Sequence, residues 1–205
     1  MADQNTAQKI LDAAIRVFAK EGLRGARMHE IARAAGVNQA LLHYYFRSKD
    51  KLYEEALFSV FSSMIENLAE KLRGGGDPEE KIRRMIYAYI DQLNANPALP
   101  RLLAAESLDG GERLKAVFDR IRIEKGLSPP EFIIPFIESG IASGRFRELD
   151  PMQTAASVIG MCLFYFIAKP VIHHIWGAPD DADAFITARK EAIVELVLHG
   201  IVKKT

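Results

Sequence analysis

The chain has 205 residues, of which 49% are hydrophobic and 26% are charged, a composition typical of a globular protein. Its single cysteine excludes an internal disulfide framework. No basic stretch followed by an apolar run opens the chain, and the longest uncharged apolar run, 152–168, falls short of a membrane-spanning helix. We therefore expect a cytoplasmic protein without a membrane segment.

The formal net charge is zero, but the charges are unevenly distributed. Residues 1–51 contain nine Lys or Arg against five Asp or Glu, whereas the rest of the chain contains 18 against 22. A small basic module attached to a mildly acidic body is a frequent layout for a DNA-binding head. A difference of four charges also arises by chance, so charge alone does not decide the function.

Helical patterns begin near the start of the chain, and no segment shows the sustained alternation of a strand. The first helix is predicted to start at an Asn5 cap and to end at Gly22, which can adopt the left-handed conformation that closes a helix. A second, short helix is predicted over 28–35 and is stopped by Gly36.

The helices that follow have recognisable first residues. Asn38 is predicted to cap a third helix that runs to about residue 46, and Ser48 a fourth that continues to the triple glycine at 74–76. Beyond it, Asp77 and Asp150 each precede a proline, a combination typical of a helix start. Including a last helix after 179–180, we expect nine or ten helices, no sheet and no repeats, which is an all-α fold.

A helix-turn-helix is predicted within residues 30–42. Gly36 suits its turn, where two short helices cross steeply over about three residues, and Ala32 and Ala35 are small enough to let them approach. Four apolar side chains can form the core beneath: Ile31, Val37, Leu42 and Phe46. Five side chains then remain on or near the outward face of the third helix: Gln39, Ala40, Leu41, His43 and Tyr44.

The stretch from Ile31 to Leu52, which reads IARAAGVNQALLHYYFRSKDKL, resembles the N-terminal domain of the TetR family of repressors. The resemblance extends from about Gln8 to Tyr53. It rests on the turn at 35–37, the aromatic cluster at 44–46 and the Ser-Lys step at 48–49, which lie together at the family's spacing.

This resemblance implies a DNA-binding helix-turn-helix domain of three helices at 1–50, followed by a helical domain for effector binding and dimerisation at 51–205. The chain would then be a sequence-specific transcriptional regulator, and a repressor, with double-stranded DNA and a small-molecule effector as its partners. It implies no enzymatic activity and no cofactor.

In this family the third helix enters the major groove, and the positions that match its DNA contacts are Asn38, Gln39, Ala40, Leu41, His43, Tyr44 and Tyr45. The Gln39 amide can pair bidentately with adenine, and Leu41 can contact a thymine methyl group. His43, Tyr44 and Tyr45 suit phosphates, which fix the register without specifying sequence. Leu41 and Tyr45 could instead be packing residues.

Two residues depart from the family pattern. His43 stands where a tyrosine is commoner, and Arg27 occupies a position that usually holds a helix-capping Thr or Ser. The cap at Arg27 is therefore expected to be lost, although its guanidinium can bind a phosphate in exchange. Lys49 lies in the first turn of the predicted fourth helix, where free N–H groups also favour a phosphate.

The stretch 155–168 is apolar on every side, so one buried face does not account for it. Together with the last helix it resembles half of the four-helix dimer interface of TetR-like proteins. A homodimer would place two recognition helices about one DNA turn apart, so that they read a pseudo-palindromic operator. Pro170 is expected to kink or break this helix, because it frees the carbonyl of Phe166.

An effector would bind inside the helical body. Candidate lining residues are Met85, Tyr89, Phe118, Phe136, Met161, Phe164, Tyr165 and His173. Each of these is also a plausible core residue, because aromatic and Met side chains at helical spacing often only fill the core. The scarcity of charge in these stretches favours a largely apolar ligand.

Two rival interpretations are an all-α enzyme and a helical protein-binding adaptor, each with a vestigial helix-turn-helix. The sequence contains no phosphate-binding glycine loop, zinc-protease helix or nucleophile elbow. A metal site is not expected, because the adjacent His173 and His174 diverge on a helix and Cys162 and His199 lie far along the chain.

Overall fold

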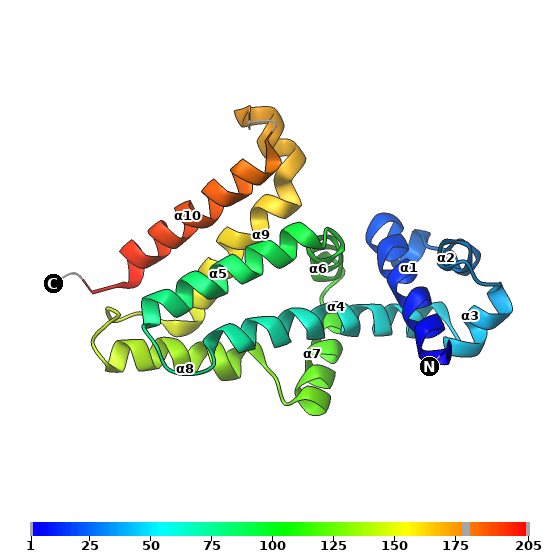
Figure 1. Cartoon of the computed structure of the whole chain (residues 1–205), viewed down its shortest axis with the longest axis horizontal. Helices are drawn as coiled ribbons and strands as arrows, with labels where there is room; N and C mark the ends of the chain where they lie inside the picture. Colours follow the sequence, from blue (N-terminus) through cyan, green and yellow to red (C-terminus); the bar gives the residue numbers. More distant parts are fainter. Residues whose placement is uncertain (1, 178–180, 204–205) are drawn as a thin grey trace. The chain divides into compact units, whose positions relative to one another are not determined.

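The computed structural model describes residues 2–177 and 181–203, within which the chain forms ten α-helices and one isolated bridge pair in place of a sheet. The all-α prediction with nine or ten helices is therefore confirmed. In chain order (Figure 1) the helices are α1 (Ala2–Gly25), α2 (Met28–Ala35), α3 (Gln39–Tyr45), α4 (Lys49–Leu72), α5 (Pro78–Ala95), α6 (Ala98–Leu108), α7 (Glu112–Lys125), α8 (Pro129–Ala142), α9 (Pro151–Trp176) and α10 (Ala182–Ile201).

Two of the predicted N-caps form at helix starts as expected. The Ser48 hydroxyl accepts a hydrogen bond from the N–H of Lys51 at 3.2 Å, and the Asp150 carboxylate accepts one from the N–H of Gln153 at 2.9 Å. Each satisfies one of the N–H groups that the first turn of a helix leaves without a partner. The predicted lead into the last helix at 179–180 lies outside the described residues.

Two other caps were predicted wrongly. Asn5 lies inside α1, because that helix already begins at Ala2. Asp77 precedes α5 as expected but makes no capping bond; its carboxylate instead accepts a hydrogen bond from Arg145 at 2.8 Å. Gly22 has the predicted positive φ of 68°, although helical turns continue beyond it to Gly25.

Helix α9 continues through Pro170 to Trp176, so of the predicted kink or break, the break is wrong. With 26 residues it is long and apolar enough to cross a membrane by length and composition, which corrects the shorter estimate from sequence. Among its residues only Cys162 and Tyr165 are buried. Length and composition do not separate a membrane span from a helix that another protein surface covers.

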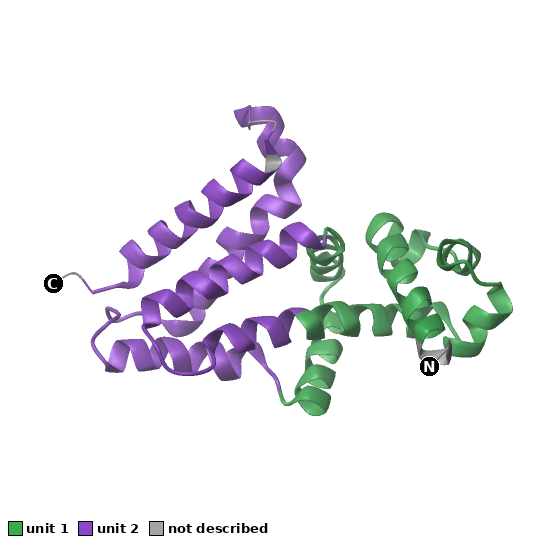
Figure 2. Cartoon of the chain, viewed as in Figure 1, with its two compact units in different colours: residues 1–63, 97–126 green, residues 64–96, 127–205 purple. Residues whose placement is uncertain are grey.

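The described residues form two compact units (Figure 2). Unit 1 comprises residues 1–63 and 97–126, and unit 2 comprises residues 64–96 and 127–205, so α4 contributes to both. The functional boundary at residue 50 stays a prediction, because α4 runs without interruption from Lys49 to Leu72.

Unit 1 contains more than the predicted head. In it α1 packs against α2 and α6, α2 against α3, and α6 against α7. Ile10, Phe18, Ile31, Leu42 and Leu52 are at most 1% exposed and form its core. The three short helices that were predicted from sequence therefore share their core with helices from the middle of the chain.

Unit 2 is built around α5, which packs against α9 and α10, while α8 packs against α9. The residue after α10 lies beside the α8–α9 connection, since Phe146 and Val202 form an antiparallel bridge. Phe146 is 2% exposed and lies directly on Gly140 of α8, where an added Cβ would come within 2.1 Å of the ring. Only glycine fits at this position.

Candidate functional site

The turn between α2 and α3 has the geometry that a helix-turn-helix needs. Gly36 ends α2 in the left-handed conformation, with φ 68° and ψ 30°. Its N–H donates to the carbonyl of Arg33 at 3.1 Å, and the N–H of Val37 donates to the carbonyl of Ala32 at 3.0 Å. These bonds satisfy the last carbonyls of α2 and direct the chain sharply into α3.

Helix α3 buries one face and exposes the other. The Asn38 side chain accepts a hydrogen bond from the N–H of Leu41 at 2.7 Å, which confirms the predicted cap, and Leu42 is fully buried. Leu41 and Tyr45 are half-buried, so part of each side chain packs against the protein. The side chains exposed on the outward face are those of Gln39, Ala40, His43 and Tyr44.

Contacts within α3 order this exposed face. The Gln39 amide nitrogen lies 3.4 Å from Nε2 of His43, one helical turn away. Tyr44 is 75% exposed, and its ring meets that of Tyr45 edge to face at 5.4 Å between centroids. A polar face held in this way can read base edges and contact phosphates at once.

Arg27 and Lys49 flank α3 in the sequence and differ in what they contact. Arg27 occupies the N-cap position of α2 with no capping bond from its side chain, as predicted, and is exposed. The Lys49 ammonium, by contrast, donates to the carbonyl of Ala26 at 3.2 Å and is half-buried. Lys49 thus ties the start of α4 to the α1–α2 junction, a role that sequence reasoning missed because the two residues are 23 positions apart.

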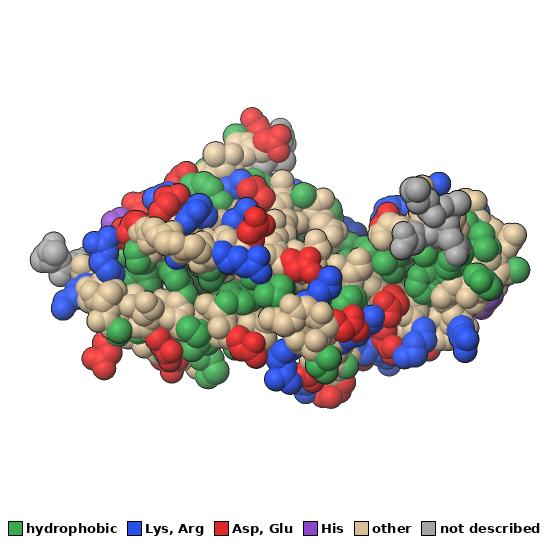
Figure 3. Space-filling model, turned by 60° about the horizontal axis from the view of Figure 1, so that its bottom comes forward, with side chains coloured by type: hydrophobic (Ala, Val, Ile, Leu, Met, Phe, Trp, Pro, Cys, Tyr) green, Lys and Arg blue, Asp and Glu red, His purple; other side chains and the backbone are tan. Residues whose placement is uncertain are grey.

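Most of the basic side chains in residues 1–51 are unpaired. Of the nine Lys and Arg in residues 1–51, six have neither an ion pair nor a side-chain hydrogen bond within the described part of the chain: Lys9, Arg16, Arg24, Arg27, Arg33 and Arg47. On the face drawn in Figure 3, positive and negative side chains are interspersed, so the chain has no uniformly basic surface there. Unpaired cations are available to DNA phosphates without the loss of an existing ion pair.

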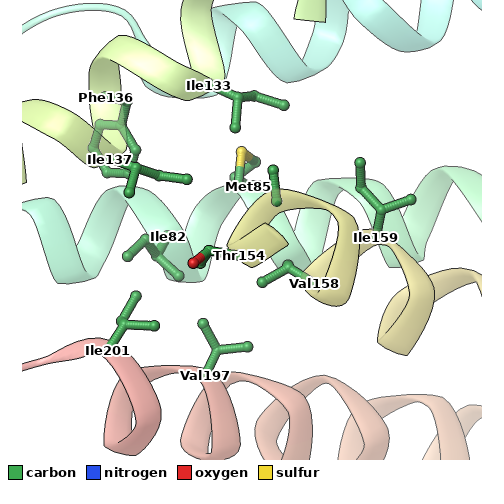
Figure 4. A pocket seen from close by; sticks show the side chains of 11 residues that line it. Ile82, Met85, Ile133, Phe136, Ile137, Thr154, Val158, Ile159, Val197 and Ile201 are labelled. Atoms are coloured by element: carbon green, nitrogen blue, oxygen red, sulfur yellow. The ribbon is translucent and has the colours of Figure 1, made fainter. Parts of the chain in front are cut away.

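Unit 2 contains a narrow apolar pocket of about 40 Å³. Figure 4 shows side chains from α5, α8, α9 and α10 pointing into the space between these helices. The one lining hydroxyl, that of Thr154, already donates to the carbonyl of Asp150 at 2.7 Å. The lining residues are Ile82, Met85, Ile133, Phe136, Ile137, Thr154, Ala155, Val158, Ile159, Val197 and Ile201.

The eight predicted ligand residues do not all meet at this pocket. Met85 and Phe136 line it. Phe118 belongs to unit 1, where its ring packs against Phe61 at 5.7 Å, and Phe164 is 62% exposed on α9. Neither of these two aromatic residues borders the pocket.

The other four candidates lie in unit 2 outside this pocket. Tyr89 is buried in α5, and Met161 lines a neighbouring groove between α9 and α10. The Tyr165 hydroxyl lies 2.9 Å from Nε2 of His173. These two side chains form a small aromatic cluster with Phe185, whose ring stacks on that of Tyr165 at 5.1 Å between centroids.

Sequence reasoning missed Arg189, which joins this cluster from α10. Its guanidinium donates to the carbonyl of Met161 at 2.6 Å and lies 4.9 Å above the ring of Tyr165. Its Nε is buried and has no hydrogen-bond partner among the described residues. Burial lowers the pKa of Arg189 below its ordinary value, and burial raises the pKa of the nearby Cys162 thiol to about 12. In the sequence Arg189 looks like any solvated charge on a terminal helix.

Comparison with known proteins assigns the chain to a family. Residues 10–56 match the model of bacterial regulatory proteins of the tetR family, and residues 78–197 match that of the tetracyclin repressor-like C-terminal domain. The HTH-type transcriptional repressor NicS of Pseudomonas putida is 32% identical over 162 residues, which are 78% of this chain and 75% of the relative. The chain belongs to the TetR family.

Other TetR-family proteins are similar over nearly the whole chain. The HTH-type transcriptional regulator RutR of Escherichia coli K12 is 26% identical over 200 residues, covering 94% of this chain and 88% of RutR. The fatty acid degradation regulator FadR from Bacillus halodurans shares the fold, with a TM-score of 0.72, 21% identity and 95% of each chain covered.

Family membership decides between the interpretations that the sequence left open. This TetR-family chain is a DNA-binding transcriptional regulator and not an enzyme, and its helix-turn-helix lies inside the matched segment 10–56. Neither family model covers residues 57–77, so most of α4 lies between the two matched segments.

We expect Gln39→Ala to lower affinity for the cognate operator about tenfold, because a bidentate contact to adenine contributes about 1–3 kcal/mol. Fluorescence anisotropy against operator and scrambled DNA measures this, and affinity for scrambled DNA should not change. The matched control is Gln8→Ala on the exposed surface of α1, where the amide bonds Asp12 at 2.8 Å. Equal losses for both variants would contradict base readout by Gln39.

Proposed function

We propose that this TetR-family regulator is a cytoplasmic homodimeric repressor that binds a pseudo-palindromic operator. Its operator affinity would change when a small, largely apolar ligand binds among the C-terminal helices. The observation that carries the proposal is the exposed polar face of α3, which Asn38 caps, in a segment of the chain with several unpaired cations.

The proposed DNA contacts divide by chemistry. Gln39 would read a base edge in the major groove, and the exposed methyl of Ala40 and the half-buried Leu41 would contact apolar groups there. Phosphates would be bound by His43, Tyr44, Tyr45 and Arg27. Asn38 would contribute indirectly, because its side chain caps the first turn of α3. Lys49 would both hold α4 against Ala26 and direct a remaining N–H towards a phosphate.

Dimerisation is supported by one apolar face of α9 that the chain itself leaves uncovered. Met152, Ile159, Phe164, Ile167, Val171, Ile175 and Trp176 are each at least 40% exposed, and Leu196 of α10 is 67% exposed. Ala156, Ser157 and Gly160 are exposed on the same helix and permit close approach of a second one. Apolar patches of this extent mark interaction sites.

The same face raises the alternative of a membrane-embedded helix. Against it, α9 packs on one side against α5, α8 and α10, and residues 78–197, which include all of α9, match the family's C-terminal domain. A second copy of the chain accounts for the face and for a two-fold operator together, so we favour the dimer.

The apolar pocket of Figure 4 is the proposed start of the ligand site. Its volume of about 40 Å³ holds only a few ligand atoms, since one water molecule alone needs about 10–15 Å³ of such space. A larger ligand would therefore separate α5, α8, α9 and α10. A ligand that prefers the separated state shifts the operator-binding equilibrium by no more than its differential affinity.

The proposed function is tested by fluorescence-anisotropy titration of the full chain against its own upstream intergenic DNA, with scrambled DNA as the control, at several salt concentrations. We expect tight binding to the native fragment that weakens steeply as salt rises, because phosphate contacts release counterions. Equal, weak binding to both fragments would contradict a local operator.

We expect Phe164→Asp to convert the dimer into a monomer and to lower operator affinity at least tenfold, because a buried unpaired carboxylate is costly at an interface. Sedimentation at micromolar concentration measures the mass. Ile123→Asp is the matched control, since Ile123 is 78% exposed on α7, outside the α9 face. A wild-type monomer would overturn the dimer outright.

A thermal-shift screen tests the ligand site. We expect aliphatic and aromatic compounds to raise the melting temperature of the wild-type chain, and Phe136→Ala to abolish the shift by removing a wall of the pocket. Phe118→Ala, a matched truncation in unit 1, should retain the shift. Stabilisation by polar anions alone would contradict a largely apolar ligand.

A further inference from the structure

Helices α6 and α7 fall within the segment that matches the family's C-terminal domain, yet they belong to the same compact unit as the helix-turn-helix. In that unit α6 packs directly against α1. The operator-binding part of the molecule is therefore larger than the segment 10–56 that carries the family's N-terminal motif. Two side-chain connections from α4 hold this larger unit together.

The first connection is a buried carboxylate on α6. Glu106 is 3% exposed, and its Oε1 accepts a hydrogen bond from the Tyr53 hydroxyl at 2.8 Å. The guanidinium of Arg113 lies 3.7 Å from the same oxygen and also contacts Asp109. A carboxylate this deeply buried is costly unless it is paired and hydrogen-bonded, so the position of Glu106 depends on these partners.

Tyr53 contacts α1 and α6 at the same time. Its ring, 1% exposed, meets Phe18 of α1 edge to face at 4.7 Å, while its hydroxyl reaches Glu106 of α6. Burial and the bond to Glu106 raise the pKa of the Tyr53 phenol, which keeps the donor proton in place. One side chain thus links three helices: α1, α4 and α6.

The second connection joins α4 to α7. Arg120 donates to both oxygens of Glu55, at 2.6 and 3.3 Å, and its guanidinium lies 4.0 Å above the ring of Phe58. One turn further along α4, Phe61 packs against Phe118 of α7 at 5.7 Å. Successive turns of α4 therefore contact α6, through Tyr53, and then α7, through Glu55 and Phe61.

We propose that α6 and α7 form a brace of the operator-binding unit, in which Tyr53 and Glu106 are positioning residues for operator recognition. Neither side chain contacts DNA. They fix α1 and α4, and through these the packed helices α2 and α3, in one rigid arrangement. A rigid arrangement lowers the conformational entropy lost when two recognition helices must match successive major grooves. The proposal rests on sequence-specific operator binding as proposed above.

The test compares full-length Tyr53→Phe, Glu106→Gln and the double variant with the wild-type chain. Tyr53→Phe keeps the ring on Phe18 and removes only the hydroxyl, and Glu106→Gln removes only the charge. The matched control is Tyr87→Phe, because the Tyr87 hydroxyl also bonds a glutamate, Glu191, but on the surface of unit 2. Operator and scrambled-DNA affinities are measured by anisotropy well below each variant's melting temperature.

We expect each single variant to lose about fivefold in operator affinity, because Tyr53→Phe removes the hydrogen bond and Glu106→Gln removes the charge that strengthens it and attracts Arg113. The double variant should lose no more than the larger single one. Affinity for scrambled DNA, and the operator affinity of Tyr87→Phe, should stay within twofold of the wild type. If operator affinity is unchanged or higher while the melting temperature falls, the pair is merely structural and the proposal is overturned. Losses of operator affinity that add up in the double variant would also overturn it.

Hydrogen exchange of the DNA-free protein separates this proposal from the proposed function. If the wild-type chain does not discriminate operator from scrambled DNA, the proposed function is wrong. The brace can still be tested in that case, because hydrogen exchange needs no DNA. The brace predicts that Glu106→Gln speeds exchange of α1 and α3 amides at least threefold, together with those of α6. Faster exchange confined to α6 and α7 would overturn it.

Discussion

Burial of the first three turns of α4 is the constraint on which the DNA-binding head depends. Leu52, Tyr53, Ala56 and Leu57 are at most 1% exposed, and each large side chain of this kind contributes about 1.5–3 kcal/mol when it leaves water. Helix α3 has only seven residues, too few to be stable alone. The recognition helix therefore persists because it is packed onto a neighbour that α4 holds in place.

The cations of unit 1 differ in whether the protein itself engages them. Cations that stabilise packing, such as Arg120 on Glu55 and Lys49 on the carbonyl of Ala26, are engaged within the protein. Arg33 and Arg47, on the exposed side of the head, have no such partner within the described residues. Six of the nine Lys and Arg in residues 1–51 are unpaired within the described part of the chain, which a net charge of zero conceals.

The fold and the exposed face of α3 could be predicted from sequence where the deciding interactions are local. The Asn38 and Asp150 caps depend on residues three positions away, and the exposed face of α3 follows from helical periodicity. The prediction failed at Asp77, whose carboxylate binds Arg145, 68 residues further on. Phe164 and Arg189 could not be assigned either, because identical side chains occur in cores, on surfaces and in pockets, and only tertiary contacts distinguish them.

The state of Cys162 has a practical consequence for spectroscopy. This is the chain's single cysteine, it is fully buried in α9, and burial raises the pKa of its thiol to about 12, so at neutral pH almost no reactive thiolate is present. A cysteine introduced on an exposed turn can therefore be labelled with a nitroxide or a fluorophore without removing the native one. In the proposed dimer, one such label on each subunit would report the separation of the two α3 helices directly, in solution and in an otherwise unmodified protein.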